Sequence, residues 1–201
     1  MRKRVTVLVA VVLILGVVAG CGTKVKRTEI DKTIDLSGRW NDTDSRLVSE
    51  EMIKDCLSKP WINKFQEKMS KDPVVIVGTI VNRSHEHINA QLFTKDLEKS
   101  LVNSVQVNVV ASKQEREEIR EERTNQGEGF TTEDTIKADG NEIGADYMLQ
   151  GSINSVKDEV KGKYVILYQV NLELINLSSN QKVWIGEKEI KKYVKKSSFS
   201  L

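Results

Sequence analysis

The chain has few of the residues that form covalent cross-links and metal shells. Among 201 residues there are two cysteines and two histidines. His85 and His87 lie two apart in one polar stretch, and no cysteine pair or HExxH helix is present to complete a zinc shell. If Cys21 is modified, as its context indicates below, only Cys56 is left, and one cysteine cannot form an internal disulfide. We therefore expect neither a disulfide-stabilised scaffold nor a metal site.

The sequence also lacks the local motifs of common enzymes. It contains no GxSxG elbow, no Walker phosphate loop and no GxGxxG segment after a strand. The many carboxylates fall in charged helices and turns, and none has the apolar context that would raise its pKa for acid or base catalysis. We expect no catalytic residues and no cofactor.

The sequence also lacks a large net charge of either sign. The formal net charge is +2, from 31 Lys and Arg against 29 Asp and Glu. Three of the basic residues, Arg2, Lys3 and Arg4, belong to an N-terminal segment without acidic residues, and the rest of the chain is close to neutral. Binding of nucleic acid needs a clustered cationic surface, so we expect no nucleic-acid partner.

The first 21 residues have the pattern of a secretory signal. A basic start is followed by the apolar run Val5–Val18, which is shorter than the ~20 residues that span a bilayer. Val18, Ala19 and Gly20 then lead into Cys21, and small residues before a cysteine resemble the lipobox of bacterial lipoproteins. We predict that residues 1–20 are removed and that Cys21 is lipidated. An uncleaved membrane anchor is the alternative.

The next segment reads as a tether. Residues 22–35 are polar and show no sustained apolar period. They span at most ~50 Å when stretched and about 20 Å as a coil. Residues 21–35 thus form a lipidated N-terminus with a flexible tether, and we expect one globular domain from 36 to 195, long enough to bury a core.

The first half of this domain alternates helix and strand patterns. One apolar stripe predicts a helix over Ser45–Leu57, capped by Asp44 or Ser45, with Cys56 as a small buried residue. Trp61, Phe65 and Met69 predict a second short helix with a buried face. The β-branched run Val74–Val81 is typical of a central strand covered on both sides.

After the strand Val74–Val81, the sequence predicts a further helix and a second strand. A helix over Asn89–Asn103 and a strand over Val105–Val110 would complete a right-handed crossover with parallel strands. Ser112 and Glu115 match a capping box before a helix that is nearly all charge. That helix has like-charged neighbours, so countercharges from the domain, from a partner or from solvent must stabilise it.

The remainder predicts a further helix and a meander. Thr131 or Thr132 can cap a helix to Ile143. From Tyr147 onward apolar and polar residues alternate, with hairpin turns at Gly162 and Ser178–Asn180 and a last strand near Lys182–Ile190. The fold class is α/β: a mixed sheet with a central βαβ crossover and a C-terminal antiparallel meander, with helices packed on the sheet.

One loop, Leu36–Ser45, is a candidate for partner contact. Its Arg-Trp pair can anchor a protein interface, and its small polar residues can cap a helix. The alternative is structural, with the tryptophan in the core and the rest as the cap. The candidate partner-binding residues are Arg39, Trp40, Asn41, Asp42 and Asp44.

Several segments in order resemble the LpoB family of penicillin-binding protein activators. Beside the loop and the lipobox, they are Val75-Ile76-Val77-Gly78, Asn82-Arg83-Ser84-x-x-His87-Ile88, Val110-Ala111-Ser112 and Gly144-Ala145-Asp146-Tyr147-Met148-Leu149-Gln150-Gly151. The resemblance covers about Leu36 to Lys192.

This resemblance implies an outer-membrane lipoprotein that faces the periplasm. Its domain would be similar to the N-terminal domain of TolB, and it would bind and stimulate a bifunctional penicillin-binding protein, a peptidoglycan synthase. Gly22 agrees, since an aspartate after the lipidated cysteine is the usual signal for inner-membrane retention. One departure is the tether, which is long and proline-rich in better-known members and has 14 residues here.

A second hypothesis is an oligomeric assembly lipoprotein of the outer membrane, similar to the curli secretion lipoprotein. Its barrel would need extra alternating segments of ~10 residues each. The sequence shows no spare pair of these, so we expect a monomer attached to the membrane by acyl chains. A periplasmic hydrolase is disfavoured because no catalytic set is present.

Overall fold

We describe the fold from a computed structural model of the chain, which describes residues 26–29 and 32–195. The chain divides into two units, 1–32 and 33–201. In the first, residues 26–29 belong to no helix or strand. The predicted signal, Cys21 and residues 196–201 lie outside the described residues. No helix within the described residues has the length and apolar character to cross a bilayer.

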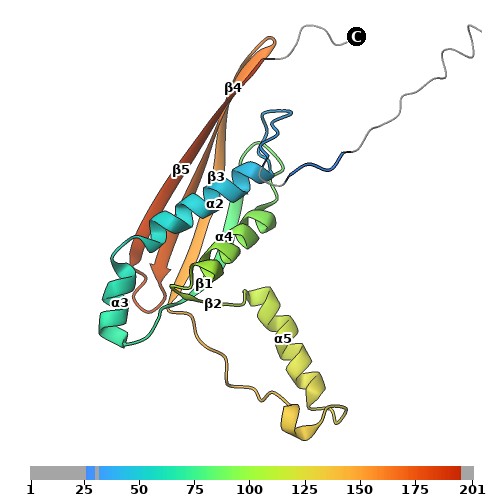
Figure 1. Cartoon of the computed structure of the whole chain (residues 1–201), viewed down its shortest axis with the longest axis vertical. Helices are drawn as coiled ribbons and strands as arrows, with labels where there is room; N and C mark the ends of the chain where they lie inside the picture. Colours follow the sequence, from blue (N-terminus) through green and yellow to red (C-terminus); the bar gives the residue numbers. More distant parts are fainter. Residues whose placement is uncertain (1–25, 30–31, 196–201) are drawn as a thin grey trace, which may run out of the picture. The chain divides into compact units, whose positions relative to one another are not determined.

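The second unit is built on a five-stranded mixed sheet with the strand order β2-β1-β3-β4-β5 (Figure 1). Its strands are β1 (Val74–Arg83), β2 (Asn108–Val110), β3 (Tyr147–Val160), β4 (Lys163–Asn176) and β5 (Lys182–Lys195). β1 pairs in parallel with both β2 and β3, whereas β3, β4 and β5 form an antiparallel meander. The predicted mixed sheet, with a βαβ unit followed by a meander, is confirmed.

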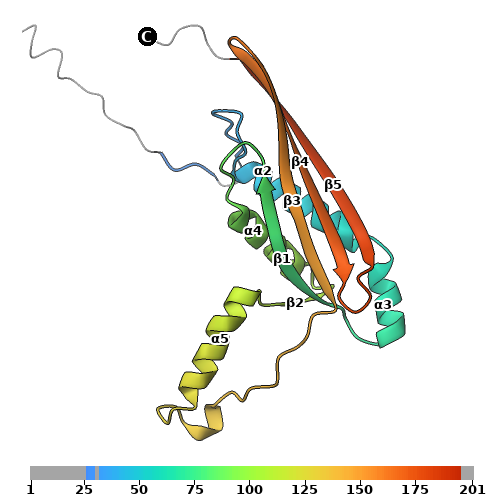
Figure 2. The same ribbon diagram turned by 180° about the vertical axis from the view of Figure 1, so that it is seen from behind.

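Four α-helices accompany the sheet within the described residues. They are α2 (Asp42–Leu57), α3 (Trp61–Met69), α4 (Ala90–Ser104) and α5 (Lys113–Gln126). α2 and α4 lie over one face of the sheet, while the strands are open to view from behind (Figures 1 and 2). The sheet therefore has a helical face and a far face.

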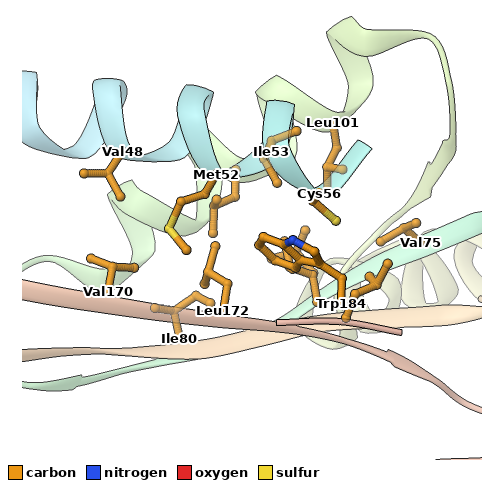
Figure 3. Packing of buried hydrophobic residues seen from close by; sticks show 14 of the residues in the cluster. Val48, Met52, Ile53, Cys56, Val75, Ile80, Leu101, Val170, Leu172 and Trp184 are labelled. Atoms are coloured by element: carbon orange, nitrogen blue, oxygen red, sulfur yellow. The ribbon is translucent and has the colours of Figure 1, made fainter. Parts of the chain in front are cut away.

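The hydrophobic core lies between the helical face and the two helices. Val48 and Met52 of α2 point down onto Val170 and Leu172 of β4, while Ile53 lies beside Leu101 of α4 (Figure 3), and each of these residues is at most 3 % exposed. Burial of this apolar surface supplies most of the driving force for folding. Cys56 belongs to the same cluster, as predicted, and is 1 % exposed.

The two predicted hairpin turns are confirmed. Gly162 joins β3 to β4 with a φ of +80°, and Asn180 precedes β5 with a φ of +58°. Glycine and asparagine tolerate this left-handed region better than other residues. β5 runs on to Lys195, beyond the predicted end at Ile190.

Two predictions about strands hold only in part. The strand predicted over Val74–Val81 forms as β1, and Val74–Val77 is buried on both faces, but Val81 is 41 % exposed, because the described helices lie over only one face of the sheet. The predicted strand Val105–Val110 is reduced to β2, since Val105 ends α4 in a left-handed conformation with φ +56°.

The helices also differ from expectation at two places. α2 begins at Asp42, and its cap is Asn41 rather than Asp44 or Ser45. The helix expected up to Ile143 is absent, and only the 3-10 turn η1 (Glu133–Thr135) forms there. Gly140, with φ +87°, interrupts the pattern, and the segment has no apolar face that packing could stabilise.

The charged helix α5 buries none of its residues. Its predicted capping box forms, with Ser112 as the cap and Glu115 bonding back to it. Lys95 of α4 pairs with Glu115, and Arg120 pairs with Glu142 at 2.7 Å. These two pairs hold the pKa of Glu115, mainly through Lys95, and that of Glu142, mainly through Arg120, down to about 2. The domain itself thus supplies part of the countercharge that the sequence requires.

Candidate functional site

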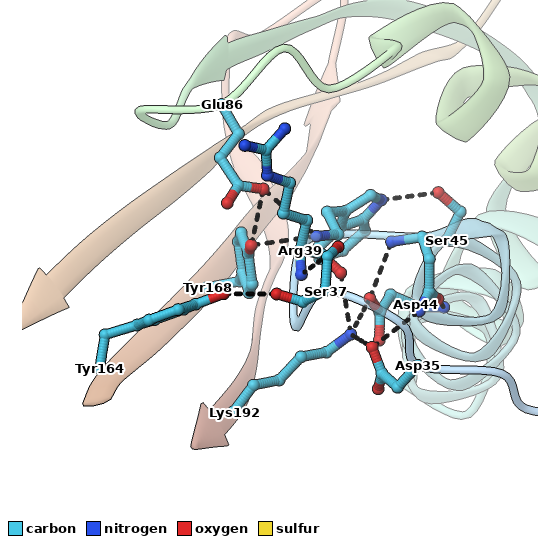
Figure 4. A network of polar contacts seen from close by, with 11 residues as sticks. Asp35, Ser37, Arg39, Asp44, Ser45, Glu86, Tyr164, Tyr168 and Lys192 are labelled. Carbon is cyan, nitrogen blue, oxygen red and sulfur yellow. Dashed lines mark hydrogen bonds and ion pairs between the residues drawn. The ribbon is translucent and has the colours of Figure 1, made fainter. Parts of the chain in front are cut away.

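The predicted contact loop packs against three distant parts of the domain. We call this region the Trp40 corner: residues 35–45 together with Glu86, Tyr164, Tyr168 and Lys192. Glu86 comes from the loop after β1, the two tyrosines from β4 and the lysine from β5. Figure 4 shows these side chains converging on the start of α2.

Trp40 anchors the corner through its ring. The ring packs edge-on against Phe93 of α4 and Tyr168 of β4, with centroid distances of 6.1 and 5.5 Å. Its indole Nε1 donates a hydrogen bond to Ser45 Oγ at 2.8 Å. Edge-to-face aromatic pairs of this kind add ~1 kcal/mol each beyond area burial. Trp40 therefore fixes the loop onto the core.

The backbone N–H of Trp40 is held by the side chains of Glu86 and Tyr168. Its N–H donates to Tyr168 Oη at 3.0 Å and to Glu86 Oε2 at 3.3 Å, and Tyr168 Oη donates to the same carboxylate oxygen at 2.7 Å. Burial, followed by the hydrogen bond to the Glu86 carboxylate, raises the pKa of Tyr168 well above its ordinary value. The phenol accordingly stays protonated and acts as a fixed donor.

Asn41 and Asp44 form the capping box of α2. Asn41 Oδ1 accepts from the Asp44 N–H at 3.0 Å, and Asp44 Oδ2 accepts from the Asn41 N–H at 2.9 Å. Each side chain satisfies a backbone donor that the first helical turn leaves free. Both residues thus stabilise the junction between loop and helix.

Lys192 ties the corner to β5. Its Nζ lies 2.6 Å from Asp44 Oδ2, and both side chains are only 10 % exposed. The same ammonium reaches Asp35 Oδ1 and the Arg39 carbonyl oxygen, each at 3.1 Å (Figure 4). One cation thus uses all three of its donors to hold the chain from 35 to 44.

The five predicted contact residues divide into two groups. The polar groups of Trp40, Asn41 and Asp44 form hydrogen bonds within the domain. This agrees with the structural alternative, in which the tryptophan packs in the core and the other residues cap the helix. Arg39 and Asp42 are exposed at the surface, and neither side chain forms a hydrogen bond or an ion pair within the described part of the chain. A partner can therefore reach these two charges directly.

Sequence reasoning missed the other half of the corner. Glu86, Tyr168 and Lys192 were part of a polar loop and two ordinary strands, separated from their partners by 46, 128 and 148 positions. No local spacing signals such contacts. Alternation does place Tyr168 on one face of its predicted strand, but Lys192 lies beyond Ile190, where the predicted last strand ended.

The remaining polar groups form no recognisable reaction centre among the described residues. The backbone N–H and Nδ1 of His85 contact Ser155 Oγ at 3.0 and 3.2 Å. No group of three His, Cys, Asp or Glu side chains in the described ranges is arranged to hold a metal ion. A groove of about 550 Å³ between α2 and α4 contains Asp96, whose pKa is raised mainly by burial. Its lining also includes charged side chains of both signs, such as Arg46 and Lys99, and the buried Ile53 and Leu57.

Comparison with protein families decides the affiliation of the chain. Residues 44–190, most of the sequence, match the family described as peptidoglycan-synthase activator LpoB. The chain belongs to the LpoB family. The match includes the sheet and its covering helices, and it confirms the resemblance drawn from the sequence motifs.

Similar solved structures include members of the LpoB family. The LpoB C-terminal domain from Escherichia coli has 14 % identity, with 72 % of this chain and 98 % of that chain covered and a TM-score of 0.40. An NMR structure of E. coli LpoB has 15 % identity, with coverage of 89 % and 84 % and a TM-score of 0.43. Lipoprotein GNA1162 from Neisseria meningitidis has 13 % identity, coverage of 60 % and 83 %, and a TM-score of 0.39. Among curated proteins, none matches the chain.

Membership gives the general role. The LpoB family is named for activating peptidoglycan synthases, which is a regulatory rather than a catalytic function. The expectation of a protein that is not an enzyme is therefore confirmed by the family.

Proposed function

We propose that this LpoB-family chain is an outer-membrane lipoprotein that binds a bifunctional penicillin-binding protein in the periplasm and activates it. The observation that carries the proposal is the family match over residues 44–190. The basic start, the short apolar run and the small residues before Cys21 support export and acylation at that cysteine.

The Trp40 corner is the proposed contact with the synthase. Arg39 and Asp42 are the groups that touch the partner, since both are exposed. Trp40, Asn41 and Asp44 keep the loop in one conformation, so little entropy is lost when a partner binds. A rigid loop with two opposite charges suits specific recognition of a complementary surface.

Activation needs no chemistry from this chain. A surface that binds the active conformation of a synthase better than the inactive one shifts the population towards activity. A preference of 1–3 kcal/mol, typical of allosteric coupling, changes the equilibrium about 5- to 150-fold.

The distance to the membrane limits which synthase is accessible. The tether, residues 22–35, has 14 residues, which reach at most ~50 Å. The partner must therefore project far from the inner membrane, or the periplasm must be thin.

The test is capture of the synthase from solubilised membranes by the acylated protein. We expect a bifunctional penicillin-binding protein to be retained, and the double variant R39A/D42A to retain about tenfold less, because two interface charges contribute over ~1 kcal/mol together. K64A/E67A is the matched control, since it removes an exposed basic and an exposed acidic residue at the same spacing on α3. If no penicillin-binding protein is captured, the proposed partner is wrong; if both variants capture equally, the proposed contact is wrong.

The oligomeric state tests the second hypothesis. The activator is proposed to be a monomer, so sedimentation of the purified protein should give a single small species. A ring of many copies would instead support an assembly lipoprotein.

A further inference from the structure

The far face of the β3–β4 hairpin carries an apolar cluster edged by lysines. We call residues 156–165 and 191–195 the hairpin tip. Residues opposite each other in antiparallel strands share a face, so the pairing register defines three rows on the far face. From the body outward, these rows are Val156, Leu167 and Lys191; Asp158, Val165 and Tyr193; and Val160, Lys163 and Lys195.

The apolar side chains of this cluster are unusually exposed. Val156 is 66 % exposed, Val160 65 % and Tyr193 63 %. The hairpin runs past the ends of α2 and α4, and none of the helices within the described residues covers its far face (Figure 2). β-branched residues favour strands in general, but this propensity does not explain why they are exposed together on one face.

The charge of the tip is one-sided. Residues 156–165 and 191–195 contain six lysines against two carboxylates, Asp158 and Glu159, although the whole chain is nearly neutral. Lys192 points to the helical face, where it pairs with Asp44, but Lys163, Lys191 and Lys195 lie on the far face beside the apolar cluster. The surface thus combines exposed aliphatic groups, one tyrosine and a cationic edge.

Residues 35–38, at the start of the domain, contact the end of the sheet that carries the hairpin tip. Tyr164 Oη donates to the Ser37 carbonyl oxygen, and Gly38 is so close to Val194 that an added Cβ would lie 2.2 Å from Val194 Cγ2. Asp35 contacts Lys192 at 3.1 Å. The other end of β4, at Asn176, lies roughly 40 Å further along the strand.

This attachment brings the tip close to any membrane that holds Cys21. The tether, residues 22–35, has only 14 residues, with a reach of at most ~50 Å. The tether therefore joins the domain at the end of the sheet that carries the hairpin tip.

We propose that the far face of the hairpin tip docks onto the anionic lipid bilayer to which Cys21 is attached. This inference rests on the acyl anchor of the proposed function. Val156 and Val160 enter the boundary between headgroups and acyl chains, as the apolar side chains of interfacial segments do. Tyr193 lies at the headgroup level, where amphipathic rings are enriched. Lys163, Lys191 and Lys195 face anionic headgroups.

Docking would orient the domain. The far face of the tip would face the lipid, and the opposite face, where Arg39 and Asp42 are exposed, would face the periplasm. An activator oriented in this way presents its contact loop to a synthase approaching from the inner membrane.

The test uses the acylated full-length protein in vesicles of phosphatidylethanolamine and phosphatidylglycerol. V160C places a thiol-reactive fluorophore on the tip, and I185C is the matched control, because Ile185 is 62 % exposed on the far face at the other end of β5. Cys56 does not compete for the label, since it is 1 % exposed. Lipids with a nitroxide near the headgroup quench only fluorophores that reach the bilayer.

We expect the vesicle-bound protein to show strong quenching at position 160 and little at 185. Adding K163Q/K191Q to V160C should lower the equilibrium constant for docking of the tip on the bilayer about 25-fold, since each lysine near an anionic surface changes that constant about fivefold. High salt should also reduce the quenching at position 160, because it screens the attraction between the lysines and the anionic headgroups.

Four other outcomes would overturn the proposal. Protein that floats with vesicles but shows no quenching at 160, or equal quenching at both positions, would exclude docking while leaving the acyl anchor intact. Energy transfer between labelled copies at 160 without lipid quenching would assign the tip to a second copy. Failure of the protein to float would contradict the acyl anchor itself, and docking with it.

Discussion

Replacing Lys192 with methionine should destabilise the domain strongly for a single surface-strand substitution. The ammonium lies 2.6 Å from Asp44 Oδ2, with both side chains 10 % exposed, and it also holds Asp35 and the Arg39 carbonyl. Methionine keeps the length of the side chain but leaves the Asp44 carboxylate without its cation. Removing one partner of a buried pair costs ~3–5 kcal/mol. Since Asp44 keeps its bond from the Asn41 N–H, we expect about 3 kcal/mol, or a fall in Tm of roughly 6–12 °C.

The assay is urea unfolding followed by circular dichroism, with K188M as the control. Lys188 lies on the same strand and the same face and makes an equally short contact of 2.6 Å to Glu51, but these side chains are 35 % and 59 % exposed. An exposed pair contributes only about 0–1 kcal/mol. In a double-mutant cycle with D44N, we expect a coupling of at least ~1 kcal/mol. Equal costs for K192M and K188M, or strictly additive costs with D44N, would refute the view that this pair fixes the Trp40 corner.

Three further predictions test the core, the thiol and the charged helix. G151A should lower the free energy of unfolding by roughly 2 kcal/mol or more, because a Cβ there would lie 2.1 Å from the Asn171 backbone oxygen of the neighbouring strand; thermal melting at wild-type Tm would contradict this clash. Burial raises the pKa of Cys56 to about 12, so the thiol should react with maleimide at pH 8 about a thousandfold more slowly in the native state than in urea, and rapid native labelling would contradict its burial. Lys95 is the main cause that lowers the pKa of Glu115 to about 2. The ionised carboxylate therefore stabilises the fold fully above its ordinary pKa near 4.5, and this stabilisation is lost as the pH falls towards 2. The protection of the α5 amides, measured relative to the intrinsic exchange rate at each pH, should fall over that range in the wild type but not in E115Q, and identical pH profiles would refute the role of this pair.

The sequence predicted best where local pattern and structure coincide. Alternation from Tyr147 onward, with Gly162 and Asn180 at the turns, specified the meander, because period-two burial and left-handed turn residues act within a few positions. The capping box of Ser112 and Glu115 was correct for the same reason. The LpoB-family motifs then added what local physics could not, namely the regulatory role.

Prediction failed where tertiary contacts override local preference. Val105 has the side chain of a strand residue, yet it ends α4 with φ +56° because the chain must turn there towards β2. Val81 looked like the residue of a doubly covered strand, but none of the described helices packs on the far face. These outcomes depend on where α2 and α4 dock, which no window of the sequence specifies.

The candidate site could be only half predicted for a similar reason. The loop was found because Arg39 and Trp40 stand out locally. Its partners Glu86, Tyr168 and Lys192 are ordinary residues of their own segments, and only the folded sheet brings them to the loop. The division between exposed charges and structural anchors likewise follows from burial, not from residue type.

The rate of glycan polymerisation by the captured penicillin-binding protein tests the central claim most directly. The synthase would be reconstituted in detergent micelles with lipid-linked substrate, with and without the purified acylated protein. We predict a severalfold increase in rate that saturates with added protein and is reduced in R39A/D42A but not in K64A/E67A, because a bound activator shifts the synthase towards its active state. An unchanged rate at saturating protein would contradict the proposal that this chain is a synthase activator.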